Sequence, residues 1–175
     1  ERGDCWLVSG KVAGHGLAVM GLRKVLSFAS ELVSDVAPLA GLANALVREI
    51  RGVRVMHDPT RGGLAGVVAD LASAGGLSIE LDESRIPVSP TARAAADMLG
   101  LDPLTVANEG KFVVVVSAED AESALAFCRS HDLGRDAAII GTVTAAQPVM
   151  VELITTFGGR RVVQKPYGEQ LPRIC

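Results

Sequence analysis

Short apolar runs with strand character alternate along the chain with stretches that repeat apolar residues at the 3.6-residue period of a helix. The runs predict strands at residues 6–11, 53–57, 77–81, 112–117, 138–143 and 149–155, with a shorter one at 161–163. The periodic stretches predict helices at about residues 17–29, 39–49, 64–74, 91–99 and 118–131. For the last helix we expect Ser117 as N-cap, with Glu119 and Asp120 in the first turn. This order of elements indicates a layered α/β or α+β fold.

Composition restricts both the core and the class of partner. Aromatic residues make up only 3% of the chain, which contains 19 Gly, so the core must consist of small aliphatic side chains at short inter-element distances. The formal net charge is -3 with acids and bases interspersed, a pattern without the basic stripe of a nucleic-acid-binding surface. No apolar stretch reaches the ~20 residues of a membrane-spanning helix, and the chain opens on charged residues rather than a signal peptide. We therefore expect a cytoplasmic protein that binds neither nucleic acid nor membranes.

The three cysteines have neither the spacing of a metal site nor that of a disulfide framework. Cys5 and Cys128 lie in apolar patterns and are expected in the core. Cys175 ends the stretch 164–175, which has no periodicity and is predicted to be an extended, flexible tail. A thiol on such an arm can leave one active site and enter another. The alternative is an incidental terminal cysteine, while a prenylation signal is excluded because its cysteine lies four residues from the end.

A glycine-rich turn separates the strand predicted at 53–57 from the helix predicted at 64–74. Its residues are Asp58, Pro59, Thr60, Arg61, Gly62 and Gly63. Glycines allow close backbone approach, free amides at a helix start attract anions, and an arginine fork binds phosphate oxygens. The same residues also suit a plain strand-to-helix turn, in which Pro59 fixes the start, Thr60 caps the helix and Arg61 pairs with a distant carboxylate.

A second polar turn, Asn108-Glu109-Gly110-Lys111, precedes the valine-rich strand. Glu109 would be held at the end of a rigid element, which makes it a candidate general base, and Asn108 is a candidate for orienting an amide. In the alternative interpretation, Asn108 and Gly110 supply permissive backbone and Glu109 pairs with Lys111 at the surface.

The remaining polar candidates are weaker. His15, between two glycines, and His57, beside Asp58, are possible pocket residues together with Lys111. The histidine spacing matches no metal motif, so we expect no metal site. His131 is expected at a helix C-terminus. Asp35 could face the tail, but we expect it to cap the helix at 39–49.

Three motifs occur in family order: 58–64 (Asp-Pro-Thr-Arg-Gly-Gly-Leu), 107–111 (Ala-Asn-Glu-Gly-Lys) and the ending 170–175 (Gln-Leu-Pro-Arg-Ile-Cys). On these motifs the chain resembles the HypE family of hydrogenase maturation proteins over essentially its whole length. The resemblance implies an α+β (α/β layered) PurM C-terminal-like domain at residues 1–163, with a mixed sheet packed by helices. The tail at 164–175 would end in a carrier cysteine. Because the chain starts without Met in a strand-like segment, we expect that an N-terminal ATP-binding domain of the full-length protein is missing.

The resemblance also implies an ATP-dependent carbamoyl dehydratase. Cys175 would receive a carbamoyl group from HypF, ATP would activate the carboxamide, and its dehydration would leave a thiocyanate whose cyano group passes to iron on the HypC–HypD complex. Cys175 and Glu109 are then the expected catalytic residues. The expected phosphate-binding or tail-channel residues are Asp58, Thr60, Arg61, Gly62, Gly63 and Asn108. ATP with Mg would be bound mainly by the missing domain, the full-length protein would be a homodimer, and this chain alone would be inactive.

Two alternatives belong to other functional classes. The chain could be a non-catalytic domain that docks maturation partners and presents the terminal thiol. It could also be another PurM-like ATP-dependent enzyme, of purine or selenium metabolism, although those reactions do not need a carboxy-terminal thiol.

Overall fold

A single mixed sheet organises the molecule. The computed structural model describes residues 1–23, 32–145 and 147–166. Its seven strands have the order β2-β4-β1-β5-β3-β6-β7, and every neighbouring pair is antiparallel except β3 and β6. The strands are β1 (Cys5–Val8), β2 (Val53–His57), β3 (Ser78–Asp82), β4 (Val113–Val116), β5 (Ala138–Thr144), β6 (Val151–Ile154) and β7 (Arg160–Val162). The predicted α+β class with a mixed sheet is confirmed.

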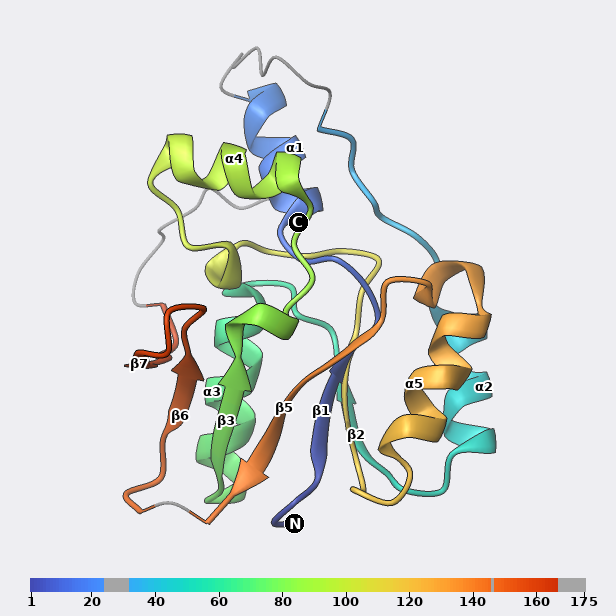
Figure 1. The fold of residues 1–175 in the computed structure, drawn as a ribbon. Helices are drawn as coiled ribbons and strands as arrows, with labels where there is room; N and C mark the ends of the chain where they lie inside the picture. Colours follow the sequence, from blue (N-terminus) through green and yellow to red (C-terminus); the bar gives the residue numbers. More distant parts are fainter. Residues whose placement is uncertain (24–31, 146, 167–175) are drawn as a thin grey trace.

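Helices cover both faces of this sheet. They are α1 (Gly14–Arg23), α2 (Ala40–Glu49), α3 (Gly63–Gly75), α4 (Pro90–Leu99) and α5 (Ala121–Ser130), with short 3-10 turns at Glu83–Arg85, Pro103–Thr105 and Asp132–Gly134. Figure 1 shows α2 and α5 side by side on one face and α3 on the other, while α1 and α4 lie together beyond one end of the strands. In the part of the chain that the structure describes, no helix is long and apolar enough to cross a membrane.

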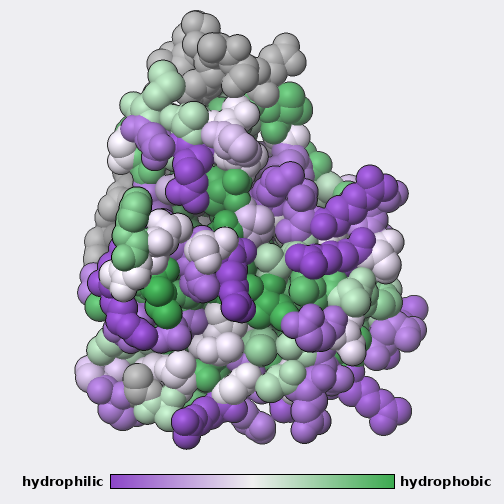
Figure 2. Space-filling view, in the orientation of Figure 1, coloured by the Kyte–Doolittle hydropathy of each residue, from purple (hydrophilic) through white to green (hydrophobic). Residues whose placement is uncertain are grey.

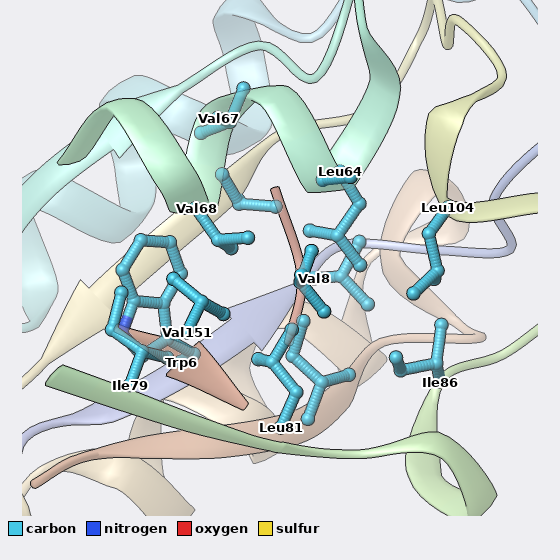
Figure 3. Close-up of a cluster of buried hydrophobic side chains, with 14 of the residues drawn as sticks. Trp6, Val8, Leu64, Val67, Val68, Ile79, Leu81, Ile86, Leu104 and Val151 are labelled. Atoms are coloured by element: carbon cyan, nitrogen blue, oxygen red, sulfur yellow. The ribbon is translucent and has the colours of Figure 1, made fainter. Parts of the chain in front are cut away.

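Alternation along β1 and β4 divides the core between the two faces. Trp6 and Val8 pack against α3 (Figure 3), whereas Leu7 between them packs towards α2 and α5. The four valines of β4 are all buried and alternate between the same two clusters. Because both faces are covered, the strand has no polar side and its sequence is continuously apolar. The outer surface is mixed, with hydrophilic and hydrophobic residues interspersed over the face shown in Figure 2.

Small side chains allow the third core cluster, between α1 and α4. Ala92, Ala95 and Ala96 of α4 are buried there against Leu17 and Met20 of α1. Helix α4 begins where the sequence rules place it, because Ser89 Oγ accepts a hydrogen bond from the Ala92 amide at 3.1 Å and Pro90 occupies the first turn.

Several predictions about element ends were wrong: the strand predicted at 6–11 is β1 at Cys5–Val8, and the helix predicted at 118–131 is α5 at Ala121–Ser130. Helix α1 begins at Gly14 rather than at 17, and the predicted range 24–29 lies outside the described residues. Ser117 is not the N-cap of α5; the N-cap is Asp120, without a side-chain cap bond. The Asp120 carboxylate instead accepts a hydrogen bond from the Gly52 amide at 2.8 Å, so it serves the loop before β2. Asp35 does not cap α2, whose N-cap is Leu39.

Candidate functional site

The sheet register brings three loops to one edge. Val8 at the end of β1 and His57 at the end of β2 both lie opposite Val113, the first residue of β4. Since β1 and β2 run antiparallel to β4, the segments that follow Val8 and His57 emerge beside the segment that precedes Val113. The two polar turns predicted from the sequence, 58–63 and 108–111, therefore lie next to each other.

Asn108 ties these loops together. Its side chain is buried, with 2% of the residue exposed. Its Oδ1 accepts a hydrogen bond from the Ala13 amide at 2.6 Å, and its Nδ2 donates to Pro59 O at 3.1 Å and to Val106 O at 3.0 Å. The backbone N–H of Asn108 also donates a hydrogen bond to Pro59 O, at 3.0 Å. Both side-chain donors are thus used by the backbone, and Asn108 acts as a clamp on the loops.

The glycine pair starts α3 without a side-chain cap. Gly62 is the N-cap, with φ 80°, so Thr60 does not cap the helix through its side chain as the plain-turn interpretation requires. Gly63 has φ 62°, and a Cβ there would lie 2.5 Å from both Leu104 O and Val106 O. Only glycine allows the start of α3 to lie this close to the segment that leads to Asn108.

Three charged side chains of these turns are wholly or partly exposed to solvent. Arg61 and Asp58 are exposed and Glu109 is half-buried. Within the described ranges, none of the three has a side-chain hydrogen bond or ion pair. Glu109 therefore does not pair with Lys111, and Arg61 does not pair with a carboxylate of the described residues.

Lys111 and His15 are both buried and both contact the segment 34–35. Lys111 Nζ lies 2.7 Å from Asp35 Oδ2, with only 9% of the lysine side chain exposed. His15 is buried, and its Nδ1 is 2.7 Å from Ser34 Oγ. His15 Nε2 is also buried and has no hydrogen-bond partner among the described residues. His57 differs, because it is exposed and its Nδ1 lies 2.8 Å from Asp58 O.

Behind the turn 108–111 lies a cavity of about 330 Å³. Charged residues of both signs line it, namely Lys11, Asp35, Lys111, Arg135 and Asp136 among others. Lys11 and Asp136 form an ion pair of 3.0 Å. With the Lys111–Asp35 pair, the cavity wall carries two internally neutralised lysine–aspartate pairs.

Sequence reasoning missed two members of this arrangement. Asp35 was expected to cap a helix, and Ala13 was not singled out although it has φ 72°. The one available signal was the stretch 34–39 (Ser-Asp-Val-Ala-Pro-Leu), which resembles a further stretch of the HypE family. No local pattern links Asp35 to a lysine that follows it by dozens of positions.

The two described cysteines are poor nucleophiles. Burial raises the pKa of the Cys128 thiol to about 11. Burial, and then the charges of Asp4 and Glu122, also raise the pKa of Cys5. Cys175 and the tail at 167–175 lie outside the described residues. Among the described residues there is no group of His, Cys, Asp and Glu that could hold a metal ion.

Residues 1–154 match the family described as AIR synthase related protein, C-terminal domain, and the chain belongs to this family. Within it, the chain is 49% identical over 174 residues to carbamoyl dehydratase HypE of Bradyrhizobium diazoefficiens, a match that covers 99% of this chain and 50% of that protein. The predicted resemblance to HypE is confirmed. The chain spans about half the length of the curated relatives it matches.

Solved structures agree with this assignment. HypE in a HypE–HypF complex superimposes with a TM-score of 0.90 at 41% identity, covering 95% of this chain and 54% of that chain. HypE in complex with ATP superimposes with a TM-score of 0.93 at 39% identity, covering 100% of this chain and 53% of that chain.

Proposed function

We propose that this chain is the C-terminal part of an ATP-dependent carbamoyl dehydratase that acts in [NiFe]-hydrogenase maturation. The observation that carries the proposal is the match to carbamoyl dehydratase HypE over 99% of the chain. The clustering of the predicted polar turns at one edge of the sheet supports it independently. The HypE structures with ATP and with HypF support a nucleotide and a HypF-type partner for the full-length protein.

The proposed reaction removes the elements of water from an S-carbamoyl group on Cys175. The carboxamide oxygen attacks the γ-phosphorus of ATP, which releases ADP, and loss of one of the two nitrogen-bound protons to solvent gives an O-phosphorylated imidate with one proton left on nitrogen. Loss of the nitrogen-bound proton and of phosphate then forms the carbon–nitrogen triple bond of a thiocyanate. The oxygen leaves in the phosphate, so carbamoyl thioester and ATP give thiocyanate, ADP and phosphate.

Each described turn has a role in this scheme. Glu109, which has no ion-pair partner among the described residues, takes the nitrogen-bound proton. Arg61 contacts phosphate oxygens together with amides of the first turn of α3, apart from that of Gly63, which donates to Thr60 O at 3.0 Å. Asp58 and Thr60 line the same approach, and His57 borders it. Asn108 contributes by holding the loops at their buried side.

The missing N-terminal half supplies the remaining functions in this proposal. It carries most of the contacts to ATP and Mg, so the chain by itself does not turn over ATP. The full-length protein works as a cytoplasmic homodimer that accepts the carbamoyl group from HypF and delivers the cyano group to the HypC–HypD complex. The domain at 1–163 presents the tail at 164–175 to these partners.

The carrier assignment is tested by labelling. Full-length protein incubated with HypF, carbamoyl phosphate and ATP should gain one carbamoyl group on Cys175, located by peptide mass spectrometry. Cys175→Ala should abolish the gain, because the pKa values of Cys5 and Cys128 are raised by burial. Equal labelling of Cys175→Ala at either of these residues would overturn the assignment.

The base is tested separately. In Glu109→Gln, carbamoylation of Cys175 should survive while conversion to thiocyanate slows by roughly 10²–10⁴-fold. The carboxamide should then persist in the mass spectrum with ATP present. Glu49→Gln, at the exposed end of α2, is the matched control. Conversion by Glu109→Gln at the unaltered rate would show that Glu109 is not the base and that Asn108-Glu109-Gly110 is a plain turn.

A further inference from the structure

An ion pair between the buried Lys111 and the partly exposed Asp35 contacts the turn that carries the candidate base. We infer that Asp35 is a positioning residue of the site: through Lys111 it holds the turn 108–111 in the conformation that presents Glu109 to its substrate. This inference rests on the proposed function, because it assigns a task to the turn that carries the proposed base.

The Lys111 side chain connects Asp35 to the turn. Its carbon stem lies over Gly10, where a Cβ would be 3.1 Å from Lys111 Cδ and Cε. Its ammonium group lies 2.7 Å from Asp35 Oδ2, and it donates more weakly to Gly110 O at 3.3 Å and Asp35 O at 3.5 Å. One cation therefore binds both the turn and the segment 34–37.

The backbones of the two segments are in direct contact at Gly110. This residue has φ 70°, and a Cβ there would lie 2.5 Å from Asp35 O and 2.5 Å from Ala37 N. Gly14 is also close to the Asp35 carboxylate, since a Cβ on this glycine would lie 3.1 Å from Asp35 Oδ2. Asp35 is thus flanked by the first residue of α1 and by the turn 108–111.

A second contact joins the segment 34–37 to the first turn of α1. Ser34 Oγ lies 2.7 Å from His15 Nδ1 and accepts a hydrogen bond from the Val36 amide at 3.3 Å. The turn 108–111 is therefore held on one side by the Asn108 hydrogen bonds and on the other by Asp35. Glu109 lies between these two attachments, and its own side chain has no partner among the described residues. The position of its carboxylate then depends on the backbone that Asp35 and Asn108 hold.

The cavity offers a matched control for this pair. Lys11–Asp136 is also a lysine–aspartate pair on its wall, with 47% and 52% of the two side chains exposed. It joins the loop after β1 to the segment before β5, and among the described residues no hydrogen bond or ion pair links it to the turn 108–111. Loss of the Lys11–Asp136 pair changes the charge of the cavity without releasing Glu109.

The experiment compares four variants of the full-length protein: Asp35→Asn, Lys111→Met, the double variant and the control Asp136→Asn. Each is carbamoylated on Cys175 by HypF, and the single-turnover rate of thiocyanate formation is followed by mass spectrometry at several ATP concentrations. Thermal unfolding is recorded for each. The double variant is included because Asp35→Asn leaves the buried ammonium group of Lys111 without its carboxylate, whereas removal of both charges does not.

We expect carbamoylation and the KM for ATP to be unchanged in all four. Thiocyanate formation should fall by about 10²-fold in both single variants, the effect of a misplacement of roughly 1 Å in a reacting group. The double variant should regain the Tm of the wild type but not its rate. Asp136→Asn should keep the wild-type rate.

The inference is overturned if the rate follows the Tm, so that the double variant regains both, or if Asp35→Asn converts at the wild-type rate. A wild-type protein that is carbamoylated on Cys175 and never forms thiocyanate would instead overturn the proposed function, and the inference with it. The two failures are therefore distinguished by the wild-type measurement.

Discussion

The side-chain oxygen of Asn108 accepts a hydrogen bond from the amide of Ala13 at 2.6 Å, although 95 positions separate the two residues. Ala13 has φ 72°, the one positive φ of a non-glycine residue in the described part of the chain. Such a conformation is unfavourable for a residue with a Cβ and persists only when its surroundings hold it. The same asparagine binds Pro59 O and Val106 O, so one buried amide fixes all three loops of the site.

Asn108→Ala should lower the free energy of unfolding by about 3 kcal/mol, because it leaves buried backbone groups of three loops unpaired. Urea denaturation of the isolated chain measures this loss. Asn44→Ala, on the exposed face of α2, is the control and should change stability by less than about 0.5 kcal/mol. Similar midpoints for the two variants would contradict the clamp role of Asn108.

Gly63→Ala and Gly76→Ala compare the two ends of α3. Both residues have similar positive φ values, 62° and 60°, but a Cβ on Gly63 meets two carbonyl oxygens at 2.5 Å, whereas a Cβ on Gly76 meets nothing within 4 Å. Gly76→Ala should therefore lower the free energy of unfolding by only about 1 kcal/mol, the effect of placing a Cβ in a left-handed backbone conformation. Gly63→Ala should cost about 4 kcal/mol, since steric overlap is added. Equal losses in urea denaturation would show that α3 can move away from the segment before Asn108.

The Cys128 thiol should make stability depend on alkaline pH. Its pKa is 9.0 ordinarily and about 11 in the folded chain, because burial disfavours the thiolate. The unfolded chain therefore releases this proton first, and the stability that the protonated thiol contributes is complete below pH 9 and is lost as the pH rises through 11. Urea denaturation measures how much more stable the wild type is than Cys128→Ala. This difference should shrink between about pH 8.5 and about 11, the range that the unfolded and folded pKa values span. A constant difference over this range would mean that the thiol titrates normally in the fold.

The isolated chain should unfold cooperatively and show no appreciable ATP turnover. Its sheet is covered on both faces by buried aliphatic clusters, which is sufficient for a cooperative transition. Circular dichroism on heating tests the first part, and phosphate release tests the second. ATP hydrolysis that survives careful repurification would place the nucleotide site in this half of the protein.

The sequence by itself determined the elements and the positions of the two polar turns. The strand predicted at 53–57 is β2 without change, and the valine run predicted as a strand is β4, buried on both sides. These features depend on the period and branching of neighbouring side chains, which act over a few residues. The two polar turns around Asp58 and Asn108 were likewise predictable, because glycine and polar residues gather there next to strands.

Only the tertiary structure decided which polar groups are partners. Ser117 and Asp35 were both expected to cap helices. The N-cap of α5 is instead Asp120, whose carboxylate accepts a hydrogen bond from the Gly52 amide, and Asp35 pairs with Lys111. The reason is that a carboxylate binds whichever donor the sheet register brings within about 3 Å. Because Val8 and His57 both lie opposite Val113, loops far apart in sequence share one edge, and the contacts of Asn108 and Asp35 follow from that geometry.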